Sequence, residues 1–279
     1  MRRITVPSNA RSPTGETNAY VYRGLLIDPA GECDALNDVV SETQIEHIAV
    51  THTHLDHVGA VAVYAERTGA TVWAQTGHID RFTETTGLEP DRTFKDGDRV
   101  GPAHAVTTPG HARDHVGFAV PPEPTDSPED RGYSTTSNRP TDEGTAGRRL
   151  LCGDLAMAEG SVVVGYPEGD MRAYLTSLRQ VLARGFASLK PGHGPPVEDP
   201  QATIERLISH RRHRETAVQD AVVEAGASTL DQVVEHAYQK DISGVEDLAS
   251  ATAAAHLAKL ARAYQIDRGW LARLDSPSA

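Results

Sequence analysis

The chain has few cysteines and no long apolar run, and both absences limit where it can work. Cys33 and Cys152 are the only cysteines in 279 residues, and neither their number nor their spacing suggests a disulfide framework. No apolar run approaches the ~18 residues that a membrane-spanning helix requires. Two arginines near the N-terminus are not followed by an apolar stretch of signal-peptide length. We therefore expect a cytoplasmic protein that has no membrane partner.

Lysine is scarce as well. The chain has 27 basic residues, of which only four are lysine, against 39 acidic residues, for a net charge of −12. An acidic composition in which arginine replaces lysine resembles that of proteins from salt-loving organisms. The alternative is a GC-rich genome combined with an ordinary solvated acidic surface. Either way, the net charge argues against tight non-specific binding to nucleic acids.

Metal-binding side chains are, in contrast, concentrated. The segment 51–57 reads Thr-His-Thr-His-Leu-Asp-His, which places three imidazoles and a carboxylate within six positions. Imidazole and carboxylate together suit borderline divalent ions such as zinc. His111, Asp154 and His193 follow at wide intervals, each at a turn marked by glycine or proline. A solvated histidine-rich turn would explain the first segment alone, but four separate loops of this kind indicate one site built across a fold.

The pattern His-x-His-x-Asp-His, followed by His, Asp and His, resembles the signature of the metallo-β-lactamase superfamily. The resemblance spans roughly residues 4–275 and implies two bound metal ions. We expect zinc, although His and Asp ligands would also accept iron or manganese. The implied ligands are His52, His54 and His111 for one ion, Asp56, His57 and His193 for the other, and Asp154 as the bridge between them.

A site of this kind carries out hydrolysis. Two ions about 3.5–4 Å apart clamp a substrate oxygen and present a bridging hydroxide, whose parent water has a pKa lowered to about 7. Asp56 is expected to orient this hydroxide and accept its proton, in addition to binding metal. His115 either acts catalytically by protonating a leaving group or forms a structural hydrogen bond. Asp28 is expected to orient a ligand or a loop rather than to bind metal.

The alternation of strands and helices before residue 200 indicates an α/β fold, and the resemblance implies an αββα sandwich with the metals at one sheet edge. We predict a hydrolase domain over 1–199. Its expected strands lie within 17–28 (two, with a turn at 23–24), 45–51, 70–74, 97–107, 116–120, 150–152 and 187–190, and its expected helices start at 55 and cover 171–183. The polar segment 121–149 is expected to be a solvated insertion, with a substrate-capping loop as the alternative.

Residues 200–279 are predicted to form a second domain. We expect helices over 201–224, from an N-cap at Ser228 to Tyr238, and over 245–264, followed by a two-stranded ribbon over 266–274. These elements predict a winged-helix-like domain that packs against the first, caps the site or forms a homodimer. The stretch 192–215 further resembles the beta-lactamase-like protein two branch of the superfamily, which pairs the hydrolase domain with a winged helix and includes RNA-cutting enzymes.

Three functions remain open for this sequence. The first is a dinuclear hydrolase that cuts phosphodiesters in single-stranded RNA, and the basic run 206–214 would then contact phosphates, unless it is only a charged helix face. The second is a hydrolase of a small-molecule thioester or lactone, as in glyoxalase II-like proteins. The third is a non-catalytic winged-helix binding protein, against which the full ligand set argues. Hydrolysis of β-lactams has the least support, because neither a secretion signal nor a lactam pocket is evident.

The acidic composition predicts a dependence on salt. Self-repulsion among the acidic groups is screened as ionic strength rises, so activity and melting temperature should increase from low to molar salt. Both can be measured in parallel over that range. Indifference to salt would leave the solvated acidic surface as the explanation.

Overall fold

The computed structural model describes residues 1–8, 10–122 and 147–276, and its strands form two sheets. The first sheet has the order β1-β2-β3-β4-β5-β6, made of Arg2–Pro7, Glu16–Tyr22, Leu25–Ile27, His47–Ala49, Thr71–Gln75 and Arg92–Phe94. The second has the order β11-β10-β9-β8-β7, made of Ser188–Pro191, Arg149–Gly153, Val116–Val120, Ala103–Thr107 and Arg99–Val100. Pairing is antiparallel from β1 to β3 and parallel from β3 to β6.

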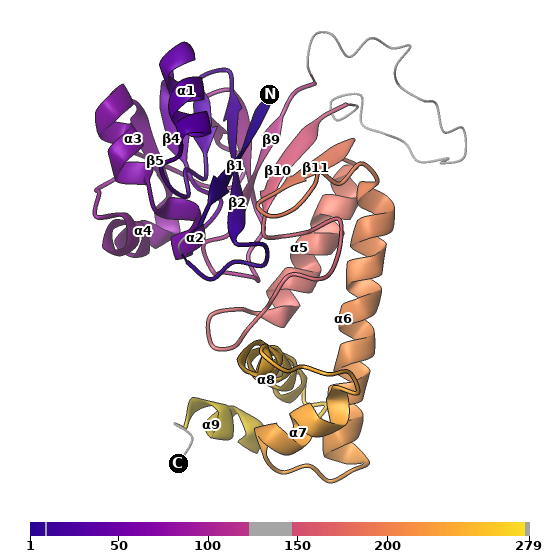
Figure 1. The fold of residues 1–279 in the computed structure, drawn as a ribbon. Coiled ribbons are helices and arrows are strands. Elements are labelled where there is room, and N and C mark those ends of the chain that lie inside the picture. The colour runs from indigo at the N-terminus through magenta and orange to yellow at the C-terminus, as the bar shows by residue number, and fades with distance from the viewer. Residues whose placement is uncertain (9, 123–146, 277–279) are drawn as a thin grey trace, which may run out of the picture.

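Helices cover the outer face of each sheet (Figure 1). The first sheet packs against α1 (Asp34–Glu42), α3 (Val61–Thr68) and α4 (Ile79–Thr86), which share one apolar core with it. The second sheet packs in the same way against α5 (Met171–Arg184) and α6 (Pro200–Val223). The predicted αββα sandwich is therefore confirmed.

The layer between the two sheets follows from the alternation of side chains along each strand. In β2, Val21 belongs to the core beneath the outer helices, whereas Tyr20 and Tyr22 face the second sheet. Phe94 and Phe118 meet across this layer with ring centroids 5.7 Å apart. Because these strands are buried on both faces, they appear in the sequence as apolar runs without a polar side.

The strands that precede the candidate site end at one edge of the sandwich. The chain leaves β4 before His52, β8 before His111, β10 before Asp154 and β11 before His193. Loops that follow strand ends are where α/β folds place their ligands. The fold thus explains why metal-competent residues occur at four distant turns of the sequence.

The helix predicted from Leu55 is interrupted. It forms two pieces, α2 (Leu55–Val58) and α3, separated at Gly59. A Cβ atom at Gly59 would lie 2.3 Å from the carbonyl oxygen of Ala30, so only glycine permits this close approach. Most of the predicted insertion at 121–149 lies outside the described residues.

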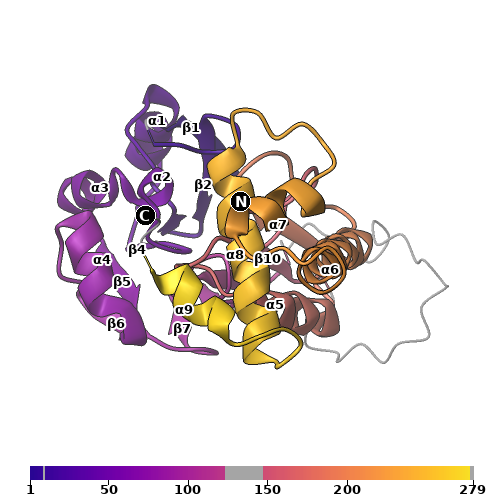
Figure 2. The ribbon, with the colours of Figure 1, turned by 90° about the horizontal axis from the view of Figure 1, so that it is seen from below.

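The C-terminal region is helical, as expected, and comprises α6, α7 (Leu230–Ala237), α8 (Glu246–Arg262) and α9 (Gly269–Asp275). It covers one end of the sandwich, as the view from below shows (Figure 2). Thr229, not Ser228, caps α7, and it forms a capping box with Gln232. None of the described helices has the length and apolar character needed to cross a lipid bilayer.

The ribbon predicted over 266–274 is wrong. Asp267-Arg268-Gly269 is a helix start rather than a hairpin turn, because the Trp270 and Leu271 amides donate to the carbonyls of Asp267 and Arg268 at 3.2 and 3.0 Å. The α9 helix that follows places Trp270, only 2% exposed, in the core formed by α6, α7 and α8. The described part of this region therefore consists of helices and lacks the terminal ribbon that a winged helix has.

The docking of α9 predicts a stability effect. Trp270→Ala should lower the free energy of unfolding by about 3–5 kcal/mol, because it removes a large side chain from a packed core. Denaturant titration followed by far-UV circular dichroism measures this loss. Val223→Ala, at a site 56% exposed at the end of α6, serves as the control and should change stability by less than about 0.5 kcal/mol. Equal effects of the two substitutions would contradict the docking of α9.

Candidate metal centre

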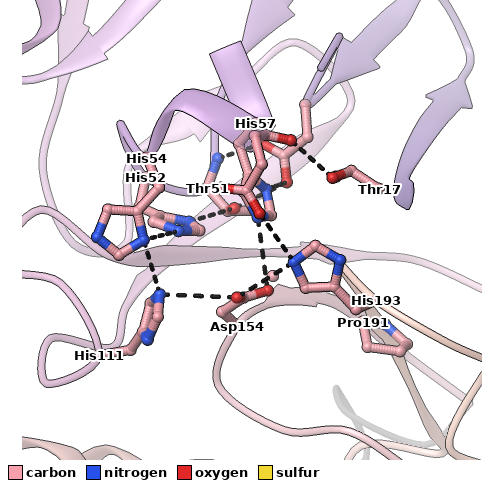
Figure 3. A network of polar contacts seen from close by, with 12 residues as sticks. Thr17, Thr51, His52, His54, His57, His111, Asp154, Pro191 and His193 are labelled. Atoms are coloured by element: carbon pink, nitrogen blue, oxygen red, sulfur yellow. Dashed lines mark hydrogen bonds and ion pairs between the residues drawn. The ribbon is translucent and has the colours of Figure 1, made fainter. Parts of the chain in front are cut away.

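The four loops bring all seven predicted side chains together at the sheet edge (Figure 3). Their potential ligand atoms fall into overlapping groups of three, and within each group the atoms lie no more than 4.8 Å apart. The groups are His52, His54 and His111; His52, His57 and Asp154; and Asp56, His57 and His193.

The first cluster consists of three imidazoles. Nδ1 of His54 lies 2.9 Å from Nε2 of His52 and 2.9 Å from Nε2 of His111. His52 is buried, and His54 and His111 are partly exposed at the mouth of the site. Three ring nitrogens aimed at one point form a donor set that suits zinc, iron or other borderline divalent ions.

The second cluster combines imidazoles and carboxylates. Nε2 of His193 lies 3.3 Å from Oδ2 of Asp56, and Nε2 of His57 lies 3.9 Å from the same oxygen. Asp154 lies between the clusters: its Oδ2 is 3.6 Å from His111 and 3.4 Å from His193, and its Oδ1 is 3.6 Å from His57. A bridging carboxylate between two cations would occupy this position.

Three buried atoms at the centre have no hydrogen-bond partner among the described residues, namely Nε2 of His57, Nε2 of His193 and Oδ1 of Asp154. Leaving buried polar atoms unsatisfied costs about 1–3 kcal/mol each. They point into the cluster, where divalent cations would satisfy them together. The residues present therefore fit a metal site.

The opposite nitrogen of each ring is held by a fixed acceptor or donor, which is typical of metal-binding histidines. The Nδ1 contacts are His57 to Asp28 at 3.0 Å, His111 to the Val163 carbonyl at 2.6 Å, His193 to the Glu16 carbonyl at 2.7 Å and His52 to the Thr51 hydroxyl at 3.1 Å. His54 is reversed, with Nδ1 in the cluster and Nε2 3.3 Å from Glu168. These contacts orient the rings before any ion binds.

Asp28 has the orienting role that the sequence predicted. Its carboxylate accepts hydrogen bonds from the Thr51 amide at 2.6 Å and the Thr51 hydroxyl at 2.8 Å, besides its contact with His57. The residue has a φ of 52°, which Asp tolerates better than most side chains. Asp28 therefore fixes both the start of the histidine loop and one ring within it.

A second orienting network was not predicted from the sequence. Asp114 accepts hydrogen bonds from the Thr53 amide at 3.0 Å and the Thr53 hydroxyl at 2.7 Å. Arg81 lies 3.6 Å from Asp114 and also pairs with Glu168, the residue that contacts His54. The hydrogen bond to His54 and the charge of Arg81 lower the pKa of Glu168 to about 2.

His115 lies behind Asp154. It is 1% exposed, its Nδ1 is 2.8 Å from the Thr108 hydroxyl, and its Nε2 accepts a hydrogen bond from the Asp154 amide at 3.0 Å. Burial lowers the pKa of His115 to about 3, so the ring is neutral. Both nitrogens are occupied, and this favours the structural hydrogen bond over protonation of a leaving group.

Charge is distributed unevenly across the centre. Burial opposes protonation of His193, but the adjacent carboxylates of Asp154 and Asp56 prevail and raise its pKa to about 10. Burial and four neighbouring imidazoles lower the pKa of His52 well below its usual value. Burial also opposes ionisation of Asp154, yet the surrounding histidines hold its pKa far below the normal range. The carboxylates thus concentrate negative charge at the second cluster.

Parts of this chain are similar in sequence to known proteins. A "Beta-lactamase-like protein 2 homolog" from Drosophila melanogaster is 29% identical over 157 residues, covering 56% of this chain and 44% of the relative. An "Atrochrysone carboxyl ACP thioesterase" from Aspergillus fumigatus is 26% identical over 114 residues, covering 41% and 27%. The matched regions span less than half of the length of these curated relatives.

A solved structure resembles nearly the whole chain. A metallo-beta-lactamase family protein from Thermus thermophilus superposes with a TM-score of 0.67 over 94% of both chains at 21% identity. The likeness therefore includes the helical C-terminal region as well as the sandwich.

The contacts of Asp28 predict an effect on metal binding. Asp28→Asn keeps the shape and the backbone conformation but loses the charged acceptor of His57, so metal affinity should fall about 10–100-fold. Competition with a chromophoric chelator measures the affinity. Asp38→Asn, an exposed change of the same kind on α1, is the control. Equal affinities of the two variants would show that Asp28 does not support the site.

The family of the chain is identified by the part that forms the sandwich and the metal centre. The family model described as "Metallo-beta-lactamase superfamily" matches residues 13–193, the range that contains every strand of the two sheets except β1 and all seven clustered side chains. The relatives and the solved structure agree with that match. This chain belongs to the metallo-beta-lactamase superfamily.

Proposed function

We propose that the protein is a dinuclear hydrolase. The observation that supports this proposal is the arrangement of the seven side chains in two clusters joined by Asp154. His52, His54 and His111 would hold the first ion, Asp56, His57 and His193 the second, and Asp154 both. We expect zinc, and the same nitrogen and oxygen donors would accept iron or manganese.

Bound ions would supply Lewis-acid activation of both the attacking water and the oxygen of the scissile bond. The protein contributes orientation and a proton acceptor. The backbone of Asp56 is held by the Thr17 hydroxyl, which donates to the Asp56 backbone carbonyl at 2.7 Å. Burial opposes ionisation of Asp56, but the neighbouring imidazole of His193, 3.3 Å away, lowers its pKa. An ionised carboxylate at this point can orient the attacking water and accept its proton.

The first candidate substrate is a phosphodiester in single-stranded RNA. The similarity to the beta-lactamase-like protein 2 homolog supports this choice, because the sequence resembles a branch that includes RNA-cutting enzymes. A phosphodiester also matches the chemistry of a two-ion site, which stabilises the attacking and the leaving oxygen together.

The second candidate is a thioester. It is supported by the similarity to a protein named as an acyl-carrier-protein thioesterase. The same water-activating site would attack a thioester carbonyl without any change in its metal ligands, since such ligands determine the nucleophile rather than the substrate.

The proposal predicts about two metal ions per chain, and Asp154→Asn should lose metal together with at least ~100-fold in turnover. Elemental analysis of the purified protein measures the metal, and Asp38→Asn should leave both quantities unchanged. Two ions retained by the Asp154→Asn variant at full activity would exclude the bridging role.

The bond is identified by parallel assays on single-stranded RNA, a phosphodiester dye, S-lactoylglutathione and a lactone. RNA cleavage that is lost in Asp56→Ala supports the first candidate. Turnover of the thioester without cleavage of RNA supports the second candidate. A purified protein with neither metal nor turnover would instead be a binding protein with an inherited site.

A further inference from the structure

A groove of about 1100 Å³ lies between the sandwich and the helical region. Its walls come from the loop at 166–170 and from α5, α6 and α8, which lie together in Figure 1. Glu168 lines the groove and also contacts His54 of the metal centre. The groove therefore begins at the mouth of the site and leads away from it.

The lining is positively charged, although the protein as a whole carries −12. Six of its side chains are cationic: Arg113, Arg172, Arg179, Arg212, Lys259 and Arg262. Its three acidic side chains are each paired: Glu168 with Arg81, Asp170 with Arg262 at 3.5 Å, and Glu215 with Lys259 at 2.6 Å.

Of the four remaining cations, Arg113 donates to the Pro167 carbonyl at 3.1 Å, which leaves three arginines. Within the part of the chain that the structure describes, Arg172, Arg179 and Arg212 have no acidic partner, and all three are exposed. Arg172 and Arg179 are seven residues apart on one face of α5, which separates them by about 10 Å along the helix axis. Arg212 reaches the same groove from α6. The positive charge is thus spread along the groove rather than gathered at one point.

The basic run 206–214 does not account for this charge by itself. Arg206, Arg211 and Arg214 donate to backbone carbonyls of Gly160, Val162 and Ala237 and serve the fold. Only Arg212 of the run's arginines lines the groove. The cations of the groove come instead from α5, α6, α8 and, with Arg113, the loop that follows β8.

We propose that this groove binds the phosphate groups of an extended substrate whose reacting bond lies at the metal centre. The inference rests on the proposed hydrolase function. The planar guanidinium group matches phosphate oxygens in a bidentate geometry, and cations about 10 Å apart suit a ligand that carries more than one phosphate. Arg172, Arg179 and Arg212 determine this specificity and do not take part in the bond cleavage.

Two sources present this chemistry, the backbone of single-stranded RNA and the phosphates of a coenzyme A thioester. The first is probed by a fluorescent single-stranded oligoribonucleotide with a cleavage-resistant phosphorothioate backbone, in a fluorescence-anisotropy titration. The second is probed by coenzyme A itself, compared by calorimetry with pantetheine, which has the same thiol arm without phosphates. Both measurements use the metal-loaded protein and need no turnover. A failure of the proposed hydrolase activity can therefore be distinguished from a failure of phosphate binding.

The test variant is Arg172→Gln with Arg179→Gln, and the matched control is Arg2→Gln with Arg23→Gln, which removes two exposed arginines elsewhere. The groove variant should raise the Kd of the ligand about tenfold or more, whereas the control should change it less than twofold. For RNA, the slope of log K against log salt should also become shallower by about 1.4, or 0.7 for each lost contact.

Each outcome decides the proposal. Oligonucleotide binding that weakens only in the groove variant supports it and identifies a nucleic-acid backbone. Binding of coenzyme A, but not of pantetheine, with the same sensitivity supports it and identifies a coenzyme. Equal effects of the groove and control variants, or wild-type protein that binds neither probe at low salt, would overturn it.

Discussion

The structure depends on the burial of carboxylates and imidazoles at one sheet edge in fixed orientations. Asp28, Thr51 and the carbonyls of Glu16 and Val163 hold the outer nitrogens of four rings, so the inner nitrogens face a common centre. Without these partners each ring could rotate and satisfy itself elsewhere. The unsatisfied inner atoms are tolerated because the surrounding sheets leave them no alternative partner, and this is what makes the site ready for cations.

The clustered side chains could be predicted because their signal is local. Each ligand-competent residue follows a strand end, and the histidine loop contains four of them within six positions. The orienting residues differ in this respect. Glu168 reaches His54 from 114 positions along the chain, and nothing in the loop around it indicates that contact. The orienting role of Asp28 could be predicted from the sequence, because this residue follows the end of a strand beside the histidine loop.

The errors in the helical region have a common cause. Asp-x-Gly favours a tight turn and also caps a helix, since in both cases a carboxylate accepts a hydrogen bond from an amide two residues on. The choice at Asp267 was decided by Trp270, whose burial against α6, α7 and α8 requires a helix. Similarly, the requirement for glycine at position 59 comes from the distant carbonyl of Ala30. Tertiary contacts of this kind leave no periodic trace in the sequence.

The long helix α6 has a further consequence. Its first half, with Ile204 and Leu207, packs in the core of the sandwich, and its second half, with Val218 and Ala221, packs in the core of the helical region. Its 24 residues contain no glycine, and their only proline is the first residue, so the helix has no natural bending point. It acts as a rigid strut about 36 Å long. Because α6 packs into both cores, it ties the helical region to the sandwich and helps to set the width of the groove between them.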